Sequence, residues 1–563
     1  MSIDIETYRL KAQEAIEYVF VKEYHNSLGI PMPIVKMLLP DDANYSTGQY
    51  YITIDKTWQI HLNFGKLPIS YHEFQNEVKV LTRHEIEHYM CCPFDVITHF
   101  RMLKRIRDVY YKHFSHLGIN IEYACGAISN QAADIIVDTK NYYRHSKETL
   151  KSEIDWIKIG ANISACPRHC KLMFLTKEAI WKEDLGINET DPEFLKIVHQ
   201  LADSFTKNGI EDKSSFLDKV EEYAEIFFKL YVEDQKNPQQ SSQQGSQQQN
   251  GQQGSQQQSG QWGVGRPKDG DEHGNAFVFA DPDKVKEAIE VLAEETSVEE
   301  FIDLLAIAGI IGMSDKQKGV LWFNVQSANI IPIVEFSNTG NKSSYTYPSV
   351  WRIGDPIEEL DLMLTYMTSP RLIPGMTTKK WGYVSNDDNG TESKQMDLLL
   401  VVDTSGSMGS AMKESANMHQ AVLASYGILS YFESTKSKVA FIGFSDKIDA
   451  YVDWSDKYDD VRERLLTNGH GGTKFPISRI KSTLDVRSRD LVTVLITNGD
   501  LGNINESVSY FRVYLNDDNK LYIFLLGGSK SLHSYEPLKN IGAKIYNANN
   551  ANEFCDMVLT DME

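Results

Sequence analysis

Cysteine is scarce in this chain, at six of 563 residues. Domains that depend on disulfide bonds carry cysteine far more densely, so the sequence predicts no disulfide scaffold and is typical of a reducing compartment. Residues 1–20 have acidic side chains where a signal peptide carries positive ones, and they contain no unbroken apolar core. We therefore expect a cytoplasmic protein.

Long apolar runs are missing too. The longest extends from Phe301 to Met313, includes Asp303, and falls short of the roughly 20 residues that cross a bilayer. The sequence thus predicts no membrane-spanning segment and no membrane partner.

Basic residues are few relative to acidic ones, with 57 Lys and Arg against 78 Asp and Glu and a net charge of −21. No cluster of Lys and Arg interrupts this balance, so phosphate backbones are repelled and nucleic acid is excluded as a partner. The chain also lacks a Gly-x-x-x-x-Gly-Lys-Ser/Thr loop. It therefore carries no P-loop ATPase of its own.

The length exceeds what one hydrophobic core supports, and a change of composition divides the chain. Residues 236–275 are dominated by Gln, Ser and Gly without an apolar period, which predicts a disordered linker. We expect a first domain over 1–235, a mixed α/β middle region of unknown role over 276–395, and a last domain over 396–563. Within the middle region, 320–395 reads as short strand-like runs between turns.

The first domain begins with strands and continues with helices. Residues 47–64 alternate and are rich in Tyr, Ile and Thr, which predicts two strands joined near Asp55. Apolar residues over 71–90 recur with a helical period, and further helices are predicted over 100–118 and 123–143. This order favours an α+β domain.

A His-Glu-x-x-His run lies inside the helix predicted over 71–90. Residues four apart share one helix face, so His84 and His88 can present their imidazoles to one metal ion. Glu85 is placed to act as a general base beside a Zn²⁺ ion. A catalytic zinc site needs a third protein ligand, and the best candidate is Asp134, which shares a helix face with Asp138.

Residues 396–563 follow a different pattern, in which short apolar strands alternate with amphipathic helices. This alternation predicts a mostly parallel, Rossmann-like sheet covered by helices. Asp403, Ser405 and Ser407 follow the strand LLLVV directly. Their hard oxygen atoms suit Mg²⁺ or another divalent cation. The alternative is a hydrogen-bonded turn that caps the next helix.

Both motifs resemble known families. The first domain resembles the zincin metallopeptidases, whose gluzincin branch has a Glu-x-x-x-Asp element. That resemblance implies that Asp134 is the third zinc ligand and Asp138 the residue that orients a ligand histidine. Residues 396–563 resemble the von Willebrand factor A family with its metal-ion-dependent adhesion site. This second resemblance implies that Thr473 and Asn498 complete the Mg²⁺ site. The family has Asp at the position of Asn498, and in this chain an aspartate, Asp500, follows two residues later.

The combination of these two domains resembles bacterial and archaeal proteins encoded beside MoxR-type AAA+ ATPases. The resemblance implies a multidomain, intracellular zinc metallopeptidase whose A domain recruits a protein partner or substrate through a divalent metal. It also implies a MoxR-type AAA+ ATPase as partner. The alternative is a non-catalytic adaptor or chaperone for such an ATPase, with a structural or inactive zinc site. The shorter Asp134 and the uncharged Asn498 favour that alternative.

Overall fold

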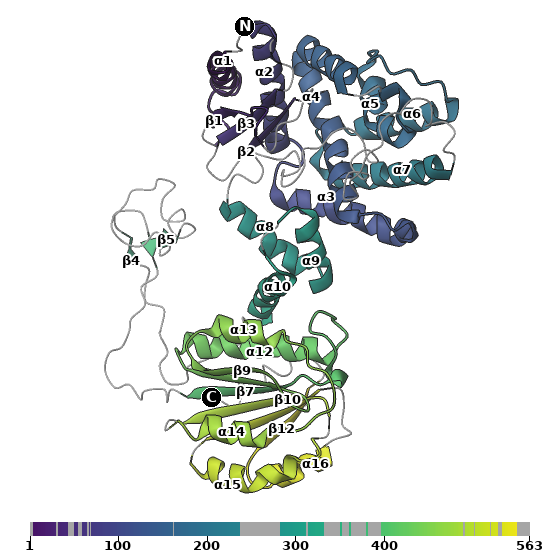
Figure 1. Ribbon diagram of the computed structural model, residues 1–563. Coiled ribbons are helices and arrows are strands. Elements are labelled where there is room, and N and C mark those ends of the chain that lie inside the picture. The colour runs from purple at the N-terminus through teal and green to yellow at the C-terminus, as the bar shows by residue number, and fades with distance from the viewer. Residues whose placement is uncertain are drawn as a thin grey trace. The chain divides into compact units, whose positions relative to one another are not determined.

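The computed structural model separates into two compact units, Met1–Ser314 and Asp315–Glu563, described in turn below (Figure 1). The boundary after Ser314 falls inside the predicted middle region. Among the described residues, no helix combines the length and hydrophobicity needed to cross a bilayer. The structure describes residues 4–29, 32–42, 50–54, 59–64, 67, 69–160, 163–236, 282–310, 313–330, 349–351, 360–361, 379–380, 396–487, 490–499, 501–517, 519–526 and 532–548. Most of the predicted linker, Asp55 and Asp500 therefore lie outside the described residues.

The first unit consists of a small sheet and a larger set of helices. Its elements are α1 (Ile5–Glu17), η1 (Tyr18–Glu23), β1 (Ile34–Met37), β2 (Tyr50–Ile54), β3 (Gln59–Phe64), α2 (Tyr71–Met90), α3 (Val96–Val109), η2 (Tyr110–Phe114), η3 (Ser115–Leu117), α4 (Ile121–Gly160), η4 (Ile163–Ala165), α5 (Arg168–Trp181), α6 (Pro192–Thr206), η5 (Lys213–Ser215), α7 (Phe216–Lys236), α8 (Pro282–Glu295) and α9 (Val298–Ile307).

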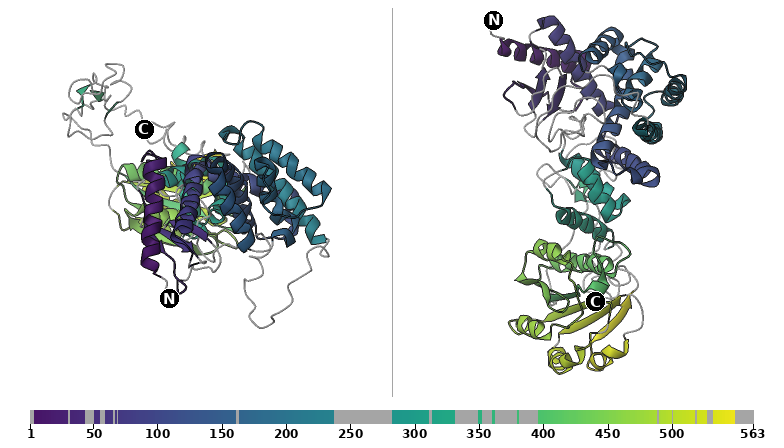
Figure 2. Two further views of the ribbon diagram at one scale, coloured as in Figure 1. Left: turned by 90° about the horizontal axis from the view of Figure 1, so that it is seen from above. Right: turned by 45° about the vertical axis from the view of Figure 1, so that its right-hand side comes forward.

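The small sheet has the strand order β1-β3-β2. Strands β2 and β3 pair antiparallel, which confirms the predicted strand pair, and β1 joins β3 in parallel. Helix α1 lies beside α2, and both cover the sheet (Figure 2). The core between them contains aromatic and aliphatic side chains from all three strands and both helices, among them Ile60, Phe64, Phe74 and Val78. Burial of these side chains fixes where α2 lies.

Helix α2 has clear start and stop signals. The Ser70 hydroxyl oxygen accepts a hydrogen bond from the Glu73 amide (3.2 Å), and the Ser70 hydroxyl donates to the Glu73 carboxylate (2.8 Å). The Ser70 hydroxyl thus satisfies one backbone donor of the first turn, and the Ser-x-x-Glu spacing is that of a capping box. The helix ends at Met90, and Pro93 follows. The helix predicted over 71–90 is thus confirmed.

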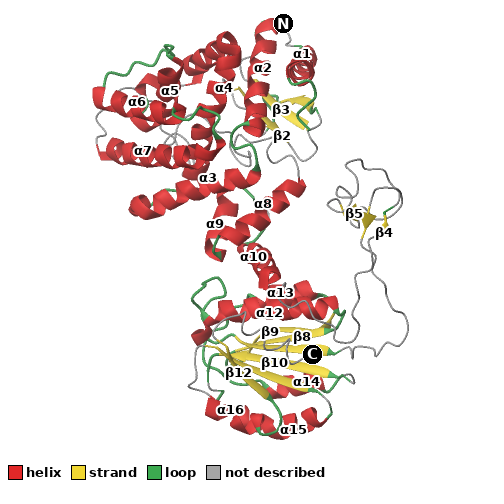
Figure 3. Ribbon diagram, turned by 180° about the vertical axis from the view of Figure 1, so that it is seen from behind, coloured by secondary structure: helices red, strands yellow, loops and turns green. Residues whose placement is uncertain are grey.

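Helix α4 is a long element against which α2, α3, α5, α7 and α9 pack. It covers 40 residues and includes the non-helical residue His145 (φ −135°, ψ 48°). Helices α5 and α7 pack on α4 and on each other, and α6 packs on α5 (Figure 3). The predicted helix over 123–143 is confirmed and extends further at both ends.

The second unit is built on one mixed sheet of six strands. Its order is β12-β11-β10-β7-β8-β9, and all neighbours are parallel except β8 and β9. Helices α12 and α13 cover one face and α14, α15 and α16 the other (Figures 1 and 3). The elements are α10 (Asp315–Ile330), β4 (Ser349–Val350), β5 (Leu360–Asp361), β6 (Lys379–Lys380), β7 (Asp397–Asp403), η9 (Gly406–Met408), α12 (Asn417–Ser434), β8 (Val439–Phe444), β9 (Ile448–Ser455), α13 (Tyr458–Leu465), α14 (Ile477–Leu484), β10 (Leu491–Thr497), η10 (Ile504–Ser507), α15 (Val508–Asn516), β11 (Lys520–Leu526), α16 (Leu532–Lys539) and β12 (Lys544–Ala548).

Helix α10 differs from the prediction, which placed strand-like runs from residue 320 onward. Trp322 and Phe323 are buried, and their rings contact His419 of α12 at centroid distances of 5.4 and 5.2 Å. Aromatic and branched residues favour strands by local propensity, but packing against α12 decides the outcome here.

Candidate metal centre

Two helices of the first unit bring three potential ligand atoms together. Helix α2 contributes Nε2 of His84 and of His88, which lie 3.1 Å apart. Helix α4 contributes Oδ1 of Asp134, which is 3.5 Å from His84 Nε2 and 3.3 Å from His88 Nε2. These three residues form a group that can hold a metal ion. The structure thus brings together the three ligands predicted from the sequence.

The Nδ1 atom of each histidine ring, on the side away from the shared centre, forms a hydrogen bond that fixes the orientation of the ring. His84 Nδ1 donates to Oδ1 of Asp138 (2.7 Å), and His88 Nδ1 donates to the Cys92 carbonyl oxygen (2.8 Å). A carboxylate and a carbonyl can only accept, so the hydrogen atoms lie on the Nδ1 atoms. In the neutral rings, both Nε2 lone pairs therefore point toward the shared centre, as metal-ligating histidines require.

Asp134 provides a second sign that the centre suits a cation. Its Oδ2 accepts a hydrogen bond from Asn130 Nδ2 (2.9 Å), whereas Oδ1 is buried and accepts none from the described part of the chain. A buried carboxylate oxygen that faces two bare imidazole nitrogens is unfavourable unless a proton or a metal lies between them.

The spacing of the three atoms fits a tetrahedral ion. Ligands about 2.05 Å from a zinc ion in tetrahedral geometry lie about 3.3 Å from each other. The observed separations are 3.1, 3.3 and 3.5 Å. Three protein ligands leave the fourth position of the tetrahedron for water or a substrate atom.

The local electrostatics favour positive charge at this centre. Burial acts to lower the pKa of His84, whereas the hydrogen-bonded Asp138 carboxylate raises it. Asp134 and Glu85 act in the same direction as Asp138, and the pKa of His84 is raised to about 10. Burial acts to raise the pKa of Asp138, but Lys177 and His84 hold it below its usual value.

The two glutamates of the His-Glu-x-x-His run have different surroundings. Glu85 is 6% exposed and close enough to His84 to influence its pKa. Glu87 is fully buried and forms ion pairs with Lys140 (2.9 Å) and Arg144 (2.8 Å) of α4. Of the two glutamates, Glu85 is therefore the one near the metal centre, whereas Glu87 connects α2 to α4 through ion pairs.

Several residues around the centre had no signal in the sequence. Lys177 of α5 donates to Asp138 Oδ2 (2.9 Å) and also contacts Glu153. The Cys92 carbonyl belongs to the turn after α2 and acts through its backbone alone. Long-range neighbours of this kind have no characteristic spacing, so only the packing of α4 and α5 reveals them.

The predicted Mg²⁺ site of the second unit lies at the position in the sheet where the strand order reverses. Strands β7 and β10 are neighbours, and the chain continues outward from each of them in opposite directions across the sheet. Asp403 ends β7, and Asn498 follows β10 directly. In open α/β sheets, ligands bind in the crevice at the carboxyl ends of the strands at such a switch point.

Hydrogen bonds join most of the predicted residues of this loop. Asp403 is fully buried and accepts from the Ser405 amide (2.9 Å) and the Thr497 hydroxyl (2.6 Å). The Ser405 and Ser407 hydroxyl oxygens lie 3.2 Å apart. Asn498 accepts from the Ser407 hydroxyl (3.1 Å) and donates to the Ser407 carbonyl (2.8 Å).

Thr473 belongs to a loop that approaches the same turn. The Gly471 carbonyl accepts a hydrogen bond from the Gly406 amide (3.4 Å). Gly471 has φ +105°, and a Cβ atom there would lie 3.2 Å from the Asp446 carboxylate, so glycine is required. Thr473 itself is half-buried. The loop therefore lies beside Gly406, the residue between Ser405 and Ser407.

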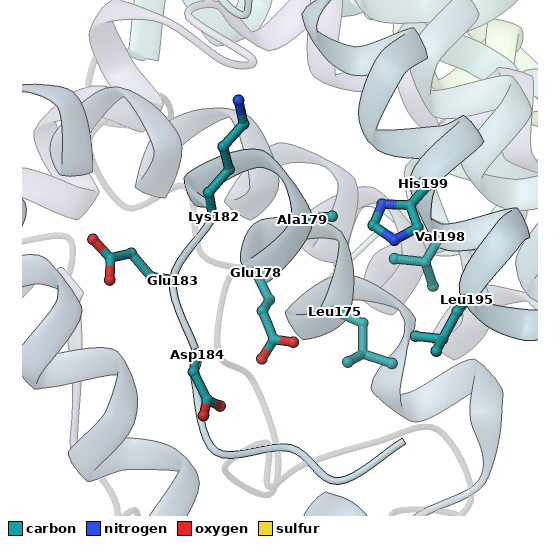
Figure 4. Close-up of a pocket in the computed structure, with 9 residues that line it drawn as sticks. All are labelled: Leu175, Glu178, Ala179, Lys182, Glu183, Asp184, Leu195, Val198 and His199. Atoms are coloured by element: carbon teal, nitrogen blue, oxygen red, sulfur yellow. The ribbon is translucent and has the colours of Figure 1, made fainter. Parts of the chain in front are cut away.

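A pocket of about 330 Å³ lies elsewhere in the first unit, between α5 and α6 (Figure 4). Leu175, Leu195 and Val198 provide apolar walls, and Glu178 and His199 provide polar groups. None of the predicted metal ligands lines it.

Comparisons with known proteins add little to this geometry. No family model matches the chain. No curated protein matches it either. The solved structures that match include the conserved hypothetical protein BatB from Bacteroides thetaiotaomicron, with 12% sequence identity and a TM-score of 0.26. The match covers 30% of this chain and 97% of BatB.

Proposed function

We propose that the first unit is a zinc-dependent metallopeptidase. The observation that carries this proposal is the convergence of His84, His88 and Asp134 at 3.1–3.5 Å, with Glu85 buried next to them. Nitrogen and carboxylate ligands in this number are the set that catalytic zinc sites use. The run that supplies the two histidines, His-Glu-x-x-His on a helix, is the zincin motif, and α4 supplies Asp134.

The residues of the site have distinct tasks in peptide hydrolysis. A bound zinc ion supplies Lewis acidity toward the scissile carbonyl and acidifies water. Glu85 accepts a proton from the attacking water and returns it to the leaving amine. Asp138 and the Cys92 carbonyl hold the two histidine rings in the tautomer that leaves Nε2 free.

For the second unit we propose a von Willebrand A domain that recruits a protein through a divalent cation, with a MoxR-type AAA+ ATPase as partner. The position of Asp403 and Asn498 at the switch point supports this proposal. Asp403, Ser405 and Ser407 offer the hard oxygen atoms that Mg²⁺ prefers. A carboxylate of the partner completes the coordination shell.

A non-catalytic adaptor or chaperone for an AAA+ ATPase is the second candidate, and the burial of the metal centre favours it. His88 is fully buried and the side chains of His84 and Asp134 are 21% and 14% exposed. Such limited exposure restricts the access of a substrate peptide to the ion, although three protein ligands leave one coordination position open. Under this reading the ion stabilises the fold and Glu85 has no substrate.

The first experiment is the zinc content of the purified chain, combined with peptidase assays on a denatured protein mixture. We expect one zinc per chain in the wild type and none in His84→Ala. Glu85→Gln should retain zinc and lose cleavage by about 10²-fold or more, because it removes the general base. Zinc without cleavage in the wild type supports the adaptor. A wild type without zinc refutes both the peptidase and the metal centre.

A further inference from the structure

Lys177 is a charged side chain in the interior of the first unit. It lies on α5, its side chain is 2% exposed, and its ammonium group contacts the carboxylates of Asp138 and Glu153, which are 13% and 15% exposed. Burial acts to lower the pKa of Lys177, but Asp138 and Glu153 outweigh it, so the pKa is raised and the side chain is charged. A buried lysine is costly and contributes little net stability even when paired. Its position relative to the metal centre suggests another use.

The two oxygens of Asp138 have different partners. Oδ1 accepts from His84 Nδ1 at 2.7 Å, and Oδ2 accepts from Lys177 Nζ at 2.9 Å. A carboxylate held by charged donors through both oxygens cannot rotate without breaking one of these bonds. The orientation of Asp138, and hence that of the His84 ring, depends on where Lys177 lies.

Lys177 is itself held in place by its surroundings. Its ammonium group lies over the rings of Phe174 (5.2 Å) and Trp181 (5.9 Å) of the same helix. The Trp181 indole N–H donates to the Thr139 hydroxyl (2.9 Å), one residue after Asp138. Helix α5 is thus fixed to α4 directly beside the carboxylate that Lys177 contacts.

We infer that Lys177 is a positioning residue for the metal centre: its ammonium group locks the Asp138 carboxylate, which in turn aims His84 Nε2 at the ion. This inference rests on the metal centre of the proposed function. It assigns Lys177 no contact with the metal or with a substrate.

The test is the zinc affinity of the full chain, measured by competition with a chromophoric chelator. Lys177→Met keeps the length of the side chain and removes its charge. Outer residues that orient metal ligands typically account for 10–100-fold in affinity, so we expect Lys177→Met to bind zinc at least about tenfold more weakly. Lys171→Met is the matched control, since Lys171 is a buried lysine of the same helix that pairs with Glu189 instead. It should bind zinc like the wild type.

The direction of the change in zinc affinity distinguishes loss of positioning from a purely Coulombic effect. Removal of a positive charge near a cation tightens binding on Coulombic grounds alone, whereas loss of positioning weakens it. Unchanged or tighter binding by Lys177→Met would overturn the inference. Failure of His84→Ala to reduce zinc binding would instead refute the metal centre, so the two failures are distinguishable.

Two further measurements separate positioning from a general loss of structure. In a double-mutant cycle with Asp138→Asn, the effect of Lys177→Met should largely disappear, and equal effects in both backgrounds would overturn the inference. The visible absorption of the Co²⁺-substituted chain reports ligand geometry, and it should change in Lys177→Met but not in Lys171→Met. If circular dichroism shows that Lys177→Met does not fold, Lys177→Gln replaces it, because it removes the charge and keeps a polar group. Unchanged zinc affinity of that variant would likewise overturn the inference, and a loss of about tenfold would support it.

Discussion

Glu87, the residue directly before His88 in the His-Glu-x-x-His run, should be a major determinant of the stability of the first unit. Its carboxylate is fully buried and contacts Tyr24 (2.9 Å), the residue after η1, and Lys140 (2.9 Å) and Arg144 (2.8 Å) of α4. These contacts join α2 to the end of η1 and to α4. They therefore hold the helix with the histidines against the helix with Asp134.

The expected cost of Glu87→Gln follows from the burial of its partners. Glutamine has nearly the same shape but carries no charge. Among the described residues, Lys140, whose side chain is 8% exposed, then keeps the half-exposed Glu211 as its one anionic partner (3.1 Å). Breaking a buried ion pair on one side costs about 3–5 kcal/mol. Arg144 is half exposed and can turn to water, so we expect the lower end, about 3 kcal/mol. That is a large part of the 5–15 kcal/mol typical of a domain.

Urea unfolding followed by circular dichroism measures this effect. The chain has two units, so two transitions are expected, and the one that added zinc shifts belongs to the first unit. Glu6→Gln is the control, because Glu6 pairs with Arg9 on the surface of α1 and its loss should leave the free energy of unfolding unchanged. A Glu87→Gln variant within about 1 kcal/mol of the wild type would show that this buried network does not hold α2 and α4 together.

Three further predictions concern both units. Zinc binding at pH 8 should release at least about one proton per ion, because the pKa of metal-free His84 is about 10 and a ligand imidazole must be neutral. Zinc affinity should accordingly rise with pH until this pKa is reached, and calorimetry in buffers of different ionisation enthalpy that detects no proton release would contradict the assignment. Asn498→Asp should tighten Mg²⁺ binding by about tenfold, since it adds a charged oxygen beside Ser407; titration calorimetry that gives equal affinities would refute this role for the loop. Phe323→Ala should lower the free energy of unfolding of the second unit by about 3–5 kcal/mol, because the ring is fully buried. The second unit is the one whose unfolding transition zinc does not shift. Val513→Ala, at a side chain 63% exposed, should leave that transition unchanged, and equal effects of the two variants would contradict the packing of α10 on the second unit.

Local patterns in the amino-acid sequence were sufficient for the elements that carry both sites. Helix α2 has its apolar period and its Ser70 capping box within twenty-odd residues, so its bounds and the shared face of His84 and His88 are predictable. The apolar runs that form β7, β8, β10 and β11 are predictable as strands for the same reason, and Asp403 lies at the end of β7. Capping and periodicity depend only on neighbours along the chain.

The tertiary structure decided how these elements meet. The sequence offers Asp134 as a candidate ligand, but its carboxylate lies beside the two histidines only because α4 crosses α2 at the right turn. Glu87 holds that crossing through residues more than fifty positions away. Lys177, from a third helix, then fixes Asp138. Each of these contacts results from burial and charge pairing between distant segments, which leave no periodic trace in the sequence. The helix α10 shows the same limit, because burial of Trp322 and Phe323 against α12 outweighs their local preference for a strand.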